Sequence, residues 1–479
     1  MADKKIVNSS VAPLMFEYFE EICKIPHGSD NEGAIADYIV KFAEERELPC
    51  FKDEANNVYV CKVATEGREK EDPILLQGHI DMVCEKDSNV KHDFLKDPLK
   101  LYVENGFLKA RGTTLGADDG IAVAAMLAVL DGAVKSHPPI ECLFTAGEEI
   151  GMVGAGKFDF SVIVANRMIN IDSEKEGKAV VGCAGGVRSE LVIPVKCVPK
   201  KGECLSVKLG GLAGGHSGED INKGRLNANR LMGRLLEELS SKIDFSVSSV
   251  NGGSKDNAIP RECVAEIDVP DFFEALYEIE SIAKRMSKEI SHDDRGFYCT
   301  ISHCQFENVL DTESADKLLC AINGVACGVI EMSVDVKGLV EWSSNLGVVQ
   351  TSEDSVKLVC LSRSGIDERI DHSMRVLDRL AKTLGGKSAH FGRYTGWSFA
   401  KTSPIRDAYM NAYKTLFGKE AECEIIHAGI ECGMVRANIP DMDMISIGPD
   451  IFALHSPAER LDIASAERLW TLLEYMLNN

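Results

Sequence analysis

Short apolar runs alternate with stretches of helical periodicity along the first 185 residues. Three apolar runs have the composition of strands, at residues 74–76, 99–110 and 140–144. Apolar residues at helical spacing predict helices at 14–25 and 35–48, and a run of small apolar residues predicts a third at 121–130. This alternation is typical of a layered α/β domain.

The pattern of apolar and polar positions changes near Gly185 and Gly186, and the earlier pattern returns near Gly392. Between these points, residues 257–262 and 345–350 are loosely alike, and each stretch precedes a predicted strand. This pattern indicates an inserted α+β domain with two half-repeats. The last segment returns to the first domain with a strand at 444–448 and a helix at 466–477. The predicted organisation is therefore 1–185, 186–391 inserted, and 392–479.

Length and charge exclude several classes of function. A chain of 479 residues is longer than one core usually holds, so two domains are expected. The 75 acidic residues outnumber the 53 basic ones, and the net charge of −22 disfavours nucleic acid and anionic membranes as partners. No apolar run approaches the roughly 20 residues that span a bilayer, and residues 1–5 lack the apolar part of a signal peptide. A cytoplasmic protein is expected.

Acidic and imidazole side chains follow the three apolar runs. His79 and Asp81 lie two residues apart at a predicted strand end, so their side chains leave the same face. One of them could bind a metal ion while the other fixes the tautomer of the imidazole. Asp118 could bridge two cations, and its neighbour Asp119 would then point elsewhere. For the His-x-Asp pair alone, a solvated strand end is the better explanation.

Glu148 and Glu149 are adjacent carboxylates whose mutual repulsion is costly unless a cation absorbs it. One could coordinate metal while the other accepts a proton from the attacking water. For this pair in isolation, two exposed glutamates at a helix start, favoured by the helix dipole, are the better explanation. Asp172 follows another apolar run, and His455 lies late in the chain.

Taken together, these strings resemble the co-catalytic zinc peptidases that include carnosine dipeptidases, carboxypeptidase G and peptidase T, and within them most closely the aminoacyl-histidine (Xaa-His) dipeptidases. The resemblance runs essentially end to end. Its most specific strings lie at residues 78–83, 114–120, 147–149, 343–347 and 427–433. It implies a di-zinc aminopeptidase-like α/β catalytic domain with a large inserted α+β lid domain at 186–391.

The resemblance assigns a role to each candidate residue. His79, Asp118 and Asp172 would bind one Zn²⁺, and Asp118, Glu149 and His455 the other, with Co²⁺ or Mn²⁺ as substitutes. Asp81 would orient His79, and Glu148 would be the general base. The peptide bond after Asp118 would be cis.

The inserted domain would supply groups that bind the substrate. His216, in a Gly-rich turn, resembles the lid histidine that donates to the oxyanion, although a turn histidine with purely local bonds explains the residue itself equally well. Relatives often hold the substrate carboxylate with an asparagine and an arginine thirteen residues later. Asn257 fits the first position, but Pro270 occupies the second. The second half-repeat supplies Arg363 at the corresponding strand end, so Arg363 is the expected carboxylate clamp, with Asn345 as a helper.

The implied function is hydrolysis of dipeptides, including β-alanyl-histidine and other Xaa-His substrates. The expected partner is a small dipeptide, and a homodimer is one option for the assembly. An amino-acid deacylase or a tripeptidase could use the same ligands. A decayed, inactive metal-binding scaffold is the alternative outside enzymes, but Glu148 and all five ligands are present.

Overall fold

The computed structural model describes residues 5–290, 292–334 and 336–479, and the chain divides into two compact units. Unit 1 comprises Met1–Gly182, Phe399–Ile425 and Ile430–Asn479, and unit 2 comprises Cys183–Ser398 and Ile426–Gly429. The expected boundary at 391/392 falls inside a strand of unit 2, β21 (Lys387–Tyr394), which pairs with β9 (Gly185–Pro194). The prediction of no leader rests largely on residues 1–4, which lie outside the described residues.

Eight strands form the main sheet of unit 1 in the order β1-β2-β6-β3-β7-β23-β8-β22. They are β1 (Cys50–Lys52), β2 (Val58–Lys62), β3 (Ile74–His79), β6 (Ile140–Thr145), β7 (Arg167–Asn170), β8 (Lys178–Cys183), β22 (Glu422–Ile426) and β23 (Asp443–Ser446). The central strands β6, β3, β7 and β23 run parallel. Both β3 and β6 are buried along their whole length, as expected for parallel strands covered on both faces. The strands predicted at 74–76 and 140–144 are confirmed.

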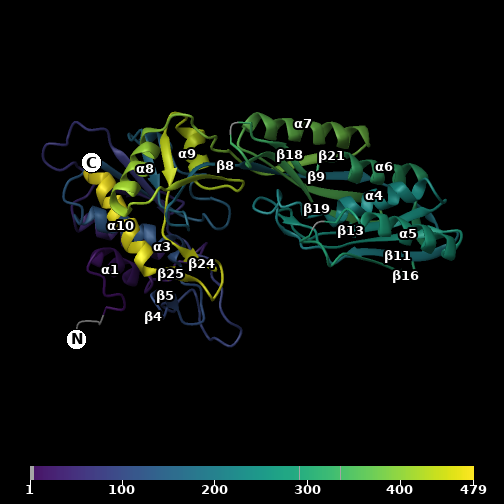
Figure 1. Ribbon diagram of the computed structural model, residues 1–479, viewed down its shortest axis with the longest axis horizontal. Coiled ribbons are helices and arrows are strands. Elements are labelled where there is room, and N and C mark those ends of the chain that lie inside the picture. The colour runs from purple at the N-terminus through teal and green to yellow at the C-terminus, as the bar shows by residue number, and fades with distance from the viewer. Residues whose placement is uncertain (1–4, 291, 335) are drawn as a thin grey trace. The chain divides into compact units, whose positions relative to one another are not determined.

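Helices form at the four predicted positions in unit 1, although the first two end earlier than predicted (Figure 1). They are α1 (Pro13–Ile22), α2 (Gly33–Glu44), α3 (Ala117–Leu130), the 3₁₀ turn η1 (Phe160–Val162), α8 (Pro404–Phe417), α9 (Cys432–Asn438) and α10 (Ile463–Asn478). The predicted helix at 14–25 ends at Ile22 because the next residues form tighter i to i−3 turns. The predicted helix at 35–48 ends at Glu44, before Glu47 takes a left-handed conformation with φ +55°.

Helix α3 is buried along almost its whole length, and it contacts both β3 and α1. Its small side chains allow this close approach. A Cβ added at Gly120 would lie 3.2 Å from the ring of Phe19 on α1. The position of α3, and with it the position of Asp118 at its first turn, is therefore set by tight packing against the sheet.

The prediction of a strand at 99–110 in the main sheet is wrong. This stretch folds into a hairpin of β4 (Leu101–Glu104) and β5 (Phe107–Ala110). Asn105 and Gly106 form the turn with φ of +52° and +83°, the backbone that an Asn-Gly hairpin turn requires. The hairpin belongs to a separate four-stranded sheet with β24 (Ile451–Phe452) and β25 (Arg460–Asp462). Asp118 thus follows no strand of the main sheet.

Unit 2 contains a nine-stranded antiparallel sheet in the order β16-β11-β15-β13-β19-β20-β9-β21, with β18 paired to β19. Its strands, apart from β9 and β21, are β11 (Glu203–Gly210), β13 (Ser246–Gly252), β15 (Cys263–Val269), β16 (Tyr298–His303), β18 (Gly328–Met332), β19 (Val340–Thr351) and β20 (Ser355–Ser364). The predicted strands at 263–269 and 356–361 are confirmed as β15 and part of β20. Residues 345–350 precede β20 as predicted, but they lie inside a strand of their own, β19.

Four helices run along the sheet of unit 2 (Figure 1). They are α4 (Ala228–Ser240), α5 (Phe272–Met286), α6 (Thr312–Gly324) and α7 (Asp367–Thr383). The alternate residues Leu205, Val207 and Leu209 of β11 are buried in the same core as the apolar residues of α4. Two short ladders complete the unit, β10 (Cys197–Pro199) with β17 (Asn308–Leu310), and β12 (Gly215–His216) with β14 (Ala258–Ile259).

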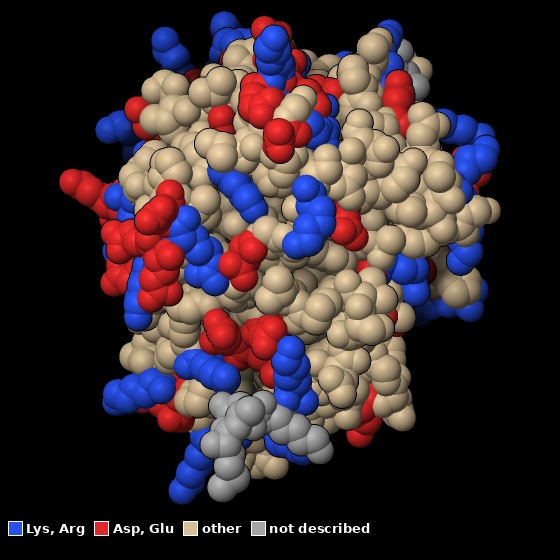
Figure 2. Space-filling view, turned by 90° about the vertical axis from the view of Figure 1, so that its left-hand side faces the viewer, with Lys and Arg blue, Asp and Glu red and all other residues tan. Residues whose placement is uncertain are grey.

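Charged side chains of both signs are interspersed on the face of the molecule shown in Figure 2, which presents no continuous basic surface. Such a face offers little to a phosphate backbone. Among the described residues, no helix is long and apolar enough to cross a bilayer.

Candidate metal centre and substrate-binding groups

Four of the predicted site residues lie together at the carboxyl edge of the parallel strands in unit 1. His79 is the last residue of β3, and it pairs with Thr145 at the end of β6. Glu148 and Glu149 follow three and four residues later. Asp172 lies just beyond β7, which runs parallel to β3 on its other side. Because parallel strands end at the same edge of a sheet, these side chains meet there.

Asp118 reaches this edge from the first turn of α3. The Asp118–Asp119 peptide bond is cis, as predicted. Oδ1 of Asp118 lies 3.2 Å from Nε2 of His79, and Oδ1 of Asp172 lies 3.5 Å from the same nitrogen. Asp119 points elsewhere, since its Oδ2 accepts a hydrogen bond from the backbone N–H of His79 at 3.2 Å.

His455 approaches the other oxygen of Asp118. Its Nε2 lies 3.3 Å from Oδ2 of Asp118 and 3.0 Å from Oε1 of Glu149. Oε1 of Glu149 is buried and makes no hydrogen bond of acceptable geometry. An imidazole nitrogen and a carboxylate oxygen that face each other in this way could both bind the same cation. The two oxygens of Asp118 therefore face two different histidines, the geometry that a bridging carboxylate needs.

Three groups of side chains in the described part of the chain could each hold a metal ion, with ligand atoms within 4.8 Å of one another. They are His79–Asp118–Asp172, Asp118–Glu149–His455 and His79–Glu148–Glu149. The first two share Asp118 and use the five residues that the sequence predicts as metal ligands. Imidazole and carboxylate donors suit Zn²⁺ and the related divalent ions.

The electrostatics of the cluster fit a site for cations. Burial and the neighbouring carboxylates of Asp118 and Glu149 raise the pKa of Asp172 to about 6, although His79 opposes this shift. Burial also opposes ionisation of Asp118, but hydrogen bonds from His455 and His79 hold its pKa below its usual value. The adjacent carboxylates of Asp118 and Glu149 raise the pKa of His455 to about 10. Crowded carboxylates of this kind are stabilised by positive charge.

Asp81 holds the backbone of the two glutamates. Its Oδ1 accepts a hydrogen bond from the N–H of Glu148 at 3.0 Å, and its Oδ2 accepts from the N–H of Glu149 at 3.3 Å. Its contact with the imidazole of His79 is longer, 3.5 Å from Nδ1, while the backbone carbonyl of Asp81 lies 3.0 Å from that nitrogen. The hydroxyl of Ser29 donates to Oδ2 at 2.8 Å, a contact 52 residues away that no local pattern indicates.

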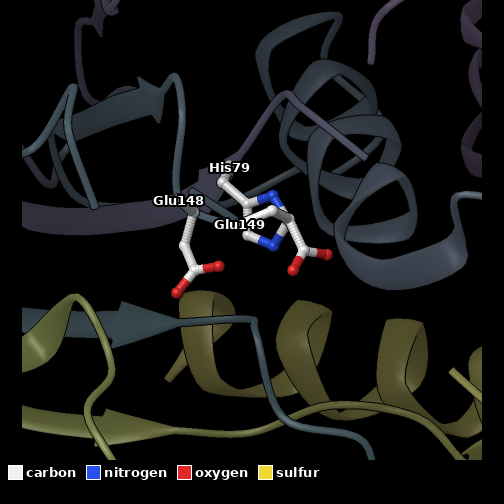
Figure 3. A group of neighbouring side chains, drawn as sticks. All are labelled: His79, Glu148 and Glu149. Atoms are coloured by element: carbon white, nitrogen blue, oxygen red, sulfur yellow. The ribbon is translucent and has the colours of Figure 1, made fainter. Parts of the chain in front are cut away.

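Glu148 lies beside the imidazole of His79, and its carboxylate diverges from that of Glu149 (Figure 3). Burial raises the pKa of Glu148 well above its usual value, and the nearby carboxylates of Asp172 and Glu431 raise it further against the effect of His79. Glu431 is itself buried, with Oε2 accepting hydrogen bonds from Gln77 at 2.5 Å and Thr145 at 2.6 Å. Glu148 is thus a carboxyl group whose proton affinity is higher than usual.

Two of the predicted substrate-binding residues, His216 and Arg363, lie near each other in unit 2. His216 forms the short ladder β12–β14, and its Nδ1 accepts a hydrogen bond from the N–H of Glu219 at 3.3 Å. Burial lowers the pKa of His216, and the nearby guanidinium of Arg363 lowers it further. A neutral imidazole that accepts at Nδ1 carries its proton on Nε2, so His216 retains a free donor.

Arg363 lies on β20 and is 5% exposed. Its Nη1 donates to the hydroxyl of Tyr394 at 2.7 Å, whereas its Nε is buried without a hydrogen-bond partner. Ser343, the cross-strand partner of Arg363, lies 2.7 Å from Nε2 of His427 through its hydroxyl. The guanidinium therefore has unused donor capacity in a polar setting.

The two asparagines differ in how much donor capacity they retain. Both hydrogens of the Asn345 amide are used, in bonds of 2.8 Å to the carbonyls of Asp256 and Ala258. Its Oδ1 accepts from Asn227 at 3.1 Å. This geometry argues against Asn345 as a donor to substrate and indicates that it positions the loop of Asn257. Asn257 is exposed, and its carbonyl accepts from the N–H of Ser217, next to His216.

Comparison with known proteins identifies the family. The pattern of peptidase family M20/M25/M40 matches residues 75–479. The chain is 39% identical over 470 residues to a cytosol non-specific dipeptidase of Escherichia coli, a match that covers 97% of this chain and 96% of the relative. The crystal structure of aminoacylhistidine dipeptidase from Vibrio alginolyticus matches with a TM-score of 0.92 and 34% identity, covering 99% of this chain and 98% of the other.

A third comparison shows the same fold at greater distance. The aminopeptidase PepT from Bacillus cereus matches with a TM-score of 0.58 and 15% identity over 99% of each chain. Together with the sequence match over most of the chain, these likenesses confirm the family predicted from the motifs. This chain belongs to peptidase family M20/M25/M40.

Proposed function

We propose that this protein is a metal-dependent dipeptidase whose substrates include β-alanyl-histidine and other Xaa-His dipeptides. The observation that carries the proposal is the pair of three-donor groups that share Asp118, with Glu148 beside them. The names of the relatives support it, since one is a cytosol non-specific dipeptidase and another an aminoacylhistidine dipeptidase.

His79, Asp118 and Asp172 would hold one ion, and Asp118, Glu149 and His455 the other. Two Zn²⁺ are the proposed cofactors, with Co²⁺ or Mn²⁺ as substitutes. When bound, the ions would polarise the scissile carbonyl and lower the pKa of the attacking water from about 15.7 towards about 7.

Glu148 is the proposed general base. It lies outside the two groups that share Asp118, yet its backbone is held by Asp81 within the same site. A carboxylate whose pKa is raised by burial accepts a proton from water more readily than an exposed one. The same carboxyl group would then deliver that proton to the leaving amine.

His216 and Arg363 are proposed to act on the substrate. The free Nε2–H of His216 would donate to the oxyanion. The guanidinium of Arg363, held at one end by Tyr394, would bind the C-terminal carboxylate of the dipeptide. Asn257 is a further candidate contact, and Asn345 would act through the loop that it holds.

Replacing Arg363 by alanine should lower kcat/KM for dipeptides with a free C-terminal carboxylate by about 10- to 100-fold, because a charge-assisted hydrogen bond is lost. The kcat/KM of the variant for the same dipeptides with an amidated C-terminus should fall only slightly. Arg393→Ala is a matched control, since Arg393 pairs with the surface carboxylates of Asp367 and Asp371 in the same unit. If Arg363→Ala hydrolyses both substrate forms in the wild-type ratio, the clamp is assigned wrongly.

A substrate panel on the zinc-loaded protein tests the function itself. We expect dipeptides, with Xaa-His and β-alanyl-histidine among them, to be cleaved faster than tripeptides and N-acyl amino acids. Faster cleavage of tripeptides or acyl amino acids would instead identify a tripeptidase or a deacylase. Two bound metal ions with no turnover of any compound would identify an inactive scaffold.

A further inference from the structure

Glu459 is a buried carboxylate that binds three consecutive backbone N–H groups of a segment distant in the sequence. Its Oε2 accepts hydrogen bonds from Leu115 at 2.7 Å and Gly116 at 3.2 Å, and its Oε1 accepts from Ala117 at 2.9 Å. The side chain is only 3% exposed. All three N–H groups directly precede Asp118.

This segment begins α3, where the first N–H groups of a helix lack partners within the helix. Gly116 is the N-cap residue and has no side chain that could bind them. Glu459 therefore takes the place of a capping side chain, and its negative charge lies at the positive end of the helix dipole. Burial raises the pKa of Glu459 to about 6, while the N–H groups favour its charged form.

The backbone of Glu459 closes the turn that directly follows His455. The N–H of Glu459 donates to the carbonyl of Ser456 at 3.0 Å, and the Ser456 hydroxyl donates to the carbonyl of Ala453 at 2.6 Å. His455 lies in the preceding turn, between Ala453 and Ser456, with a left-handed φ of +55°. The Glu459 side chain thus fixes the end of two consecutive turns, the first of which carries His455, to the segment that precedes Asp118.

We infer that Glu459 is a positioning residue that holds Asp118 and His455 in place for the metal ion they would share with Glu149. The inference rests on the proposed metal centre. His79 and Asp172 have no such link to Glu459, so the ion of the His79 group should depend on Glu459 less than the ion of the His455 group.

Glu141 provides a matched control within the same unit. It is a buried glutamate of β6 that also accepts backbone hydrogen bonds, from Val164 at 3.1 and 3.2 Å and from Ala165 at 3.2 Å. None of its bonds leads to a candidate ligand. Glu141→Gln should therefore reproduce the general cost of weakening a buried carboxylate–amide contact without disturbing the site.

The experiment titrates Zn²⁺ into metal-free wild type, Glu459→Gln and Glu141→Gln, in competition with a chelator. Wild type and Glu141→Gln should each bind two ions. Glu459→Gln should bind one of them about 10- to 100-fold more weakly, the scale seen when a residue that orients a ligand is removed. Unchanged affinity at both sites, or an equal loss in Glu141→Gln, would overturn the inference. Wild type that binds fewer than two ions would instead contradict the proposed function.

A second measurement needs no variant and covers the case in which Glu459→Gln does not fold. In metal-free wild type, the amide hydrogens of residues 115–117 should exchange slowly with deuterium, because the clamp exists before metal binds. Fast exchange that becomes slow only on addition of Zn²⁺ would show that the metal, and not Glu459, orders this segment.

Discussion

Glu148→Gln should lower the turnover of a dipeptide by at least about two orders of magnitude, the usual scale for loss of a general base, while both metal ions remain bound. The amide of glutamine has nearly the shape of the carboxylate but cannot accept a proton from the attacking water. The backbone contact with Asp81 does not involve the changed side chain and should persist. Turnover and metal content are measured on the same preparation.

Glu149→Gln is the matched control at the neighbouring position. Glu149 approaches His455 at 3.0 Å in the group that shares Asp118, so its replacement should weaken the binding of one metal ion. The two variants thus separate proton transfer from metal binding. If Glu148→Gln loses a metal ion as well, Glu148 is a ligand and the third donor group, His79–Glu148–Glu149, is the one in use.

His216→Ala should lower kcat by about 100-fold with a small change in KM, because a donor to the oxyanion acts mainly in the transition state and contributes about 3 kcal/mol. The structure supplies the reason for a donor role, since Nδ1 is occupied by the N–H of Glu219 and Nε2 carries the proton. Steady-state kinetics on a dipeptide and zinc analysis check both parts of this expectation.

His303→Ala serves as the control in unit 2. His303 is an exposed histidine of β16 that stacks on Phe272. Its replacement should leave kcat unchanged. A loss of zinc in His216→Ala, or a change confined to KM, would contradict the assignment of His216 to the oxyanion.

Local sequence was sufficient to predict which side chains lie together at the ends of β3 and β6. The buried runs that become β3 and β6 predict strands by composition alone, and parallel strands bring their carboxyl ends to one edge. The position of His79 and of the Glu148–Glu149 pair directly after these runs therefore predicts that they lie together. The resemblance to the family extended this to Asp172, His455 and the cis bond after Asp118.

Local periodicity failed where a turn interrupts an apolar stretch. Residues 99–110 have the composition of one long strand, but Asn105 and Gly106 adopt positive φ and split it into a hairpin of a separate sheet. A helix, α3, then carries Asp118 to the site. The sequence contained the Asn-Gly signal, but its two flanking strands were too short to be distinguished from one continuous run.

The sequence by itself determined the family, the presence of two units and the types of side chain in the candidate metal centre, because these follow from composition, local periodicity and short motifs. Only the tertiary structure decided which polar groups are already occupied. Asn345 uses both amide hydrogens on the loop of Asn257, whereas the Nε–H of Arg363 makes no hydrogen bond. Glu459 reaches N–H groups more than 340 residues away. Such partnerships depend on how distant segments pack against one another, and no local pattern encodes that packing.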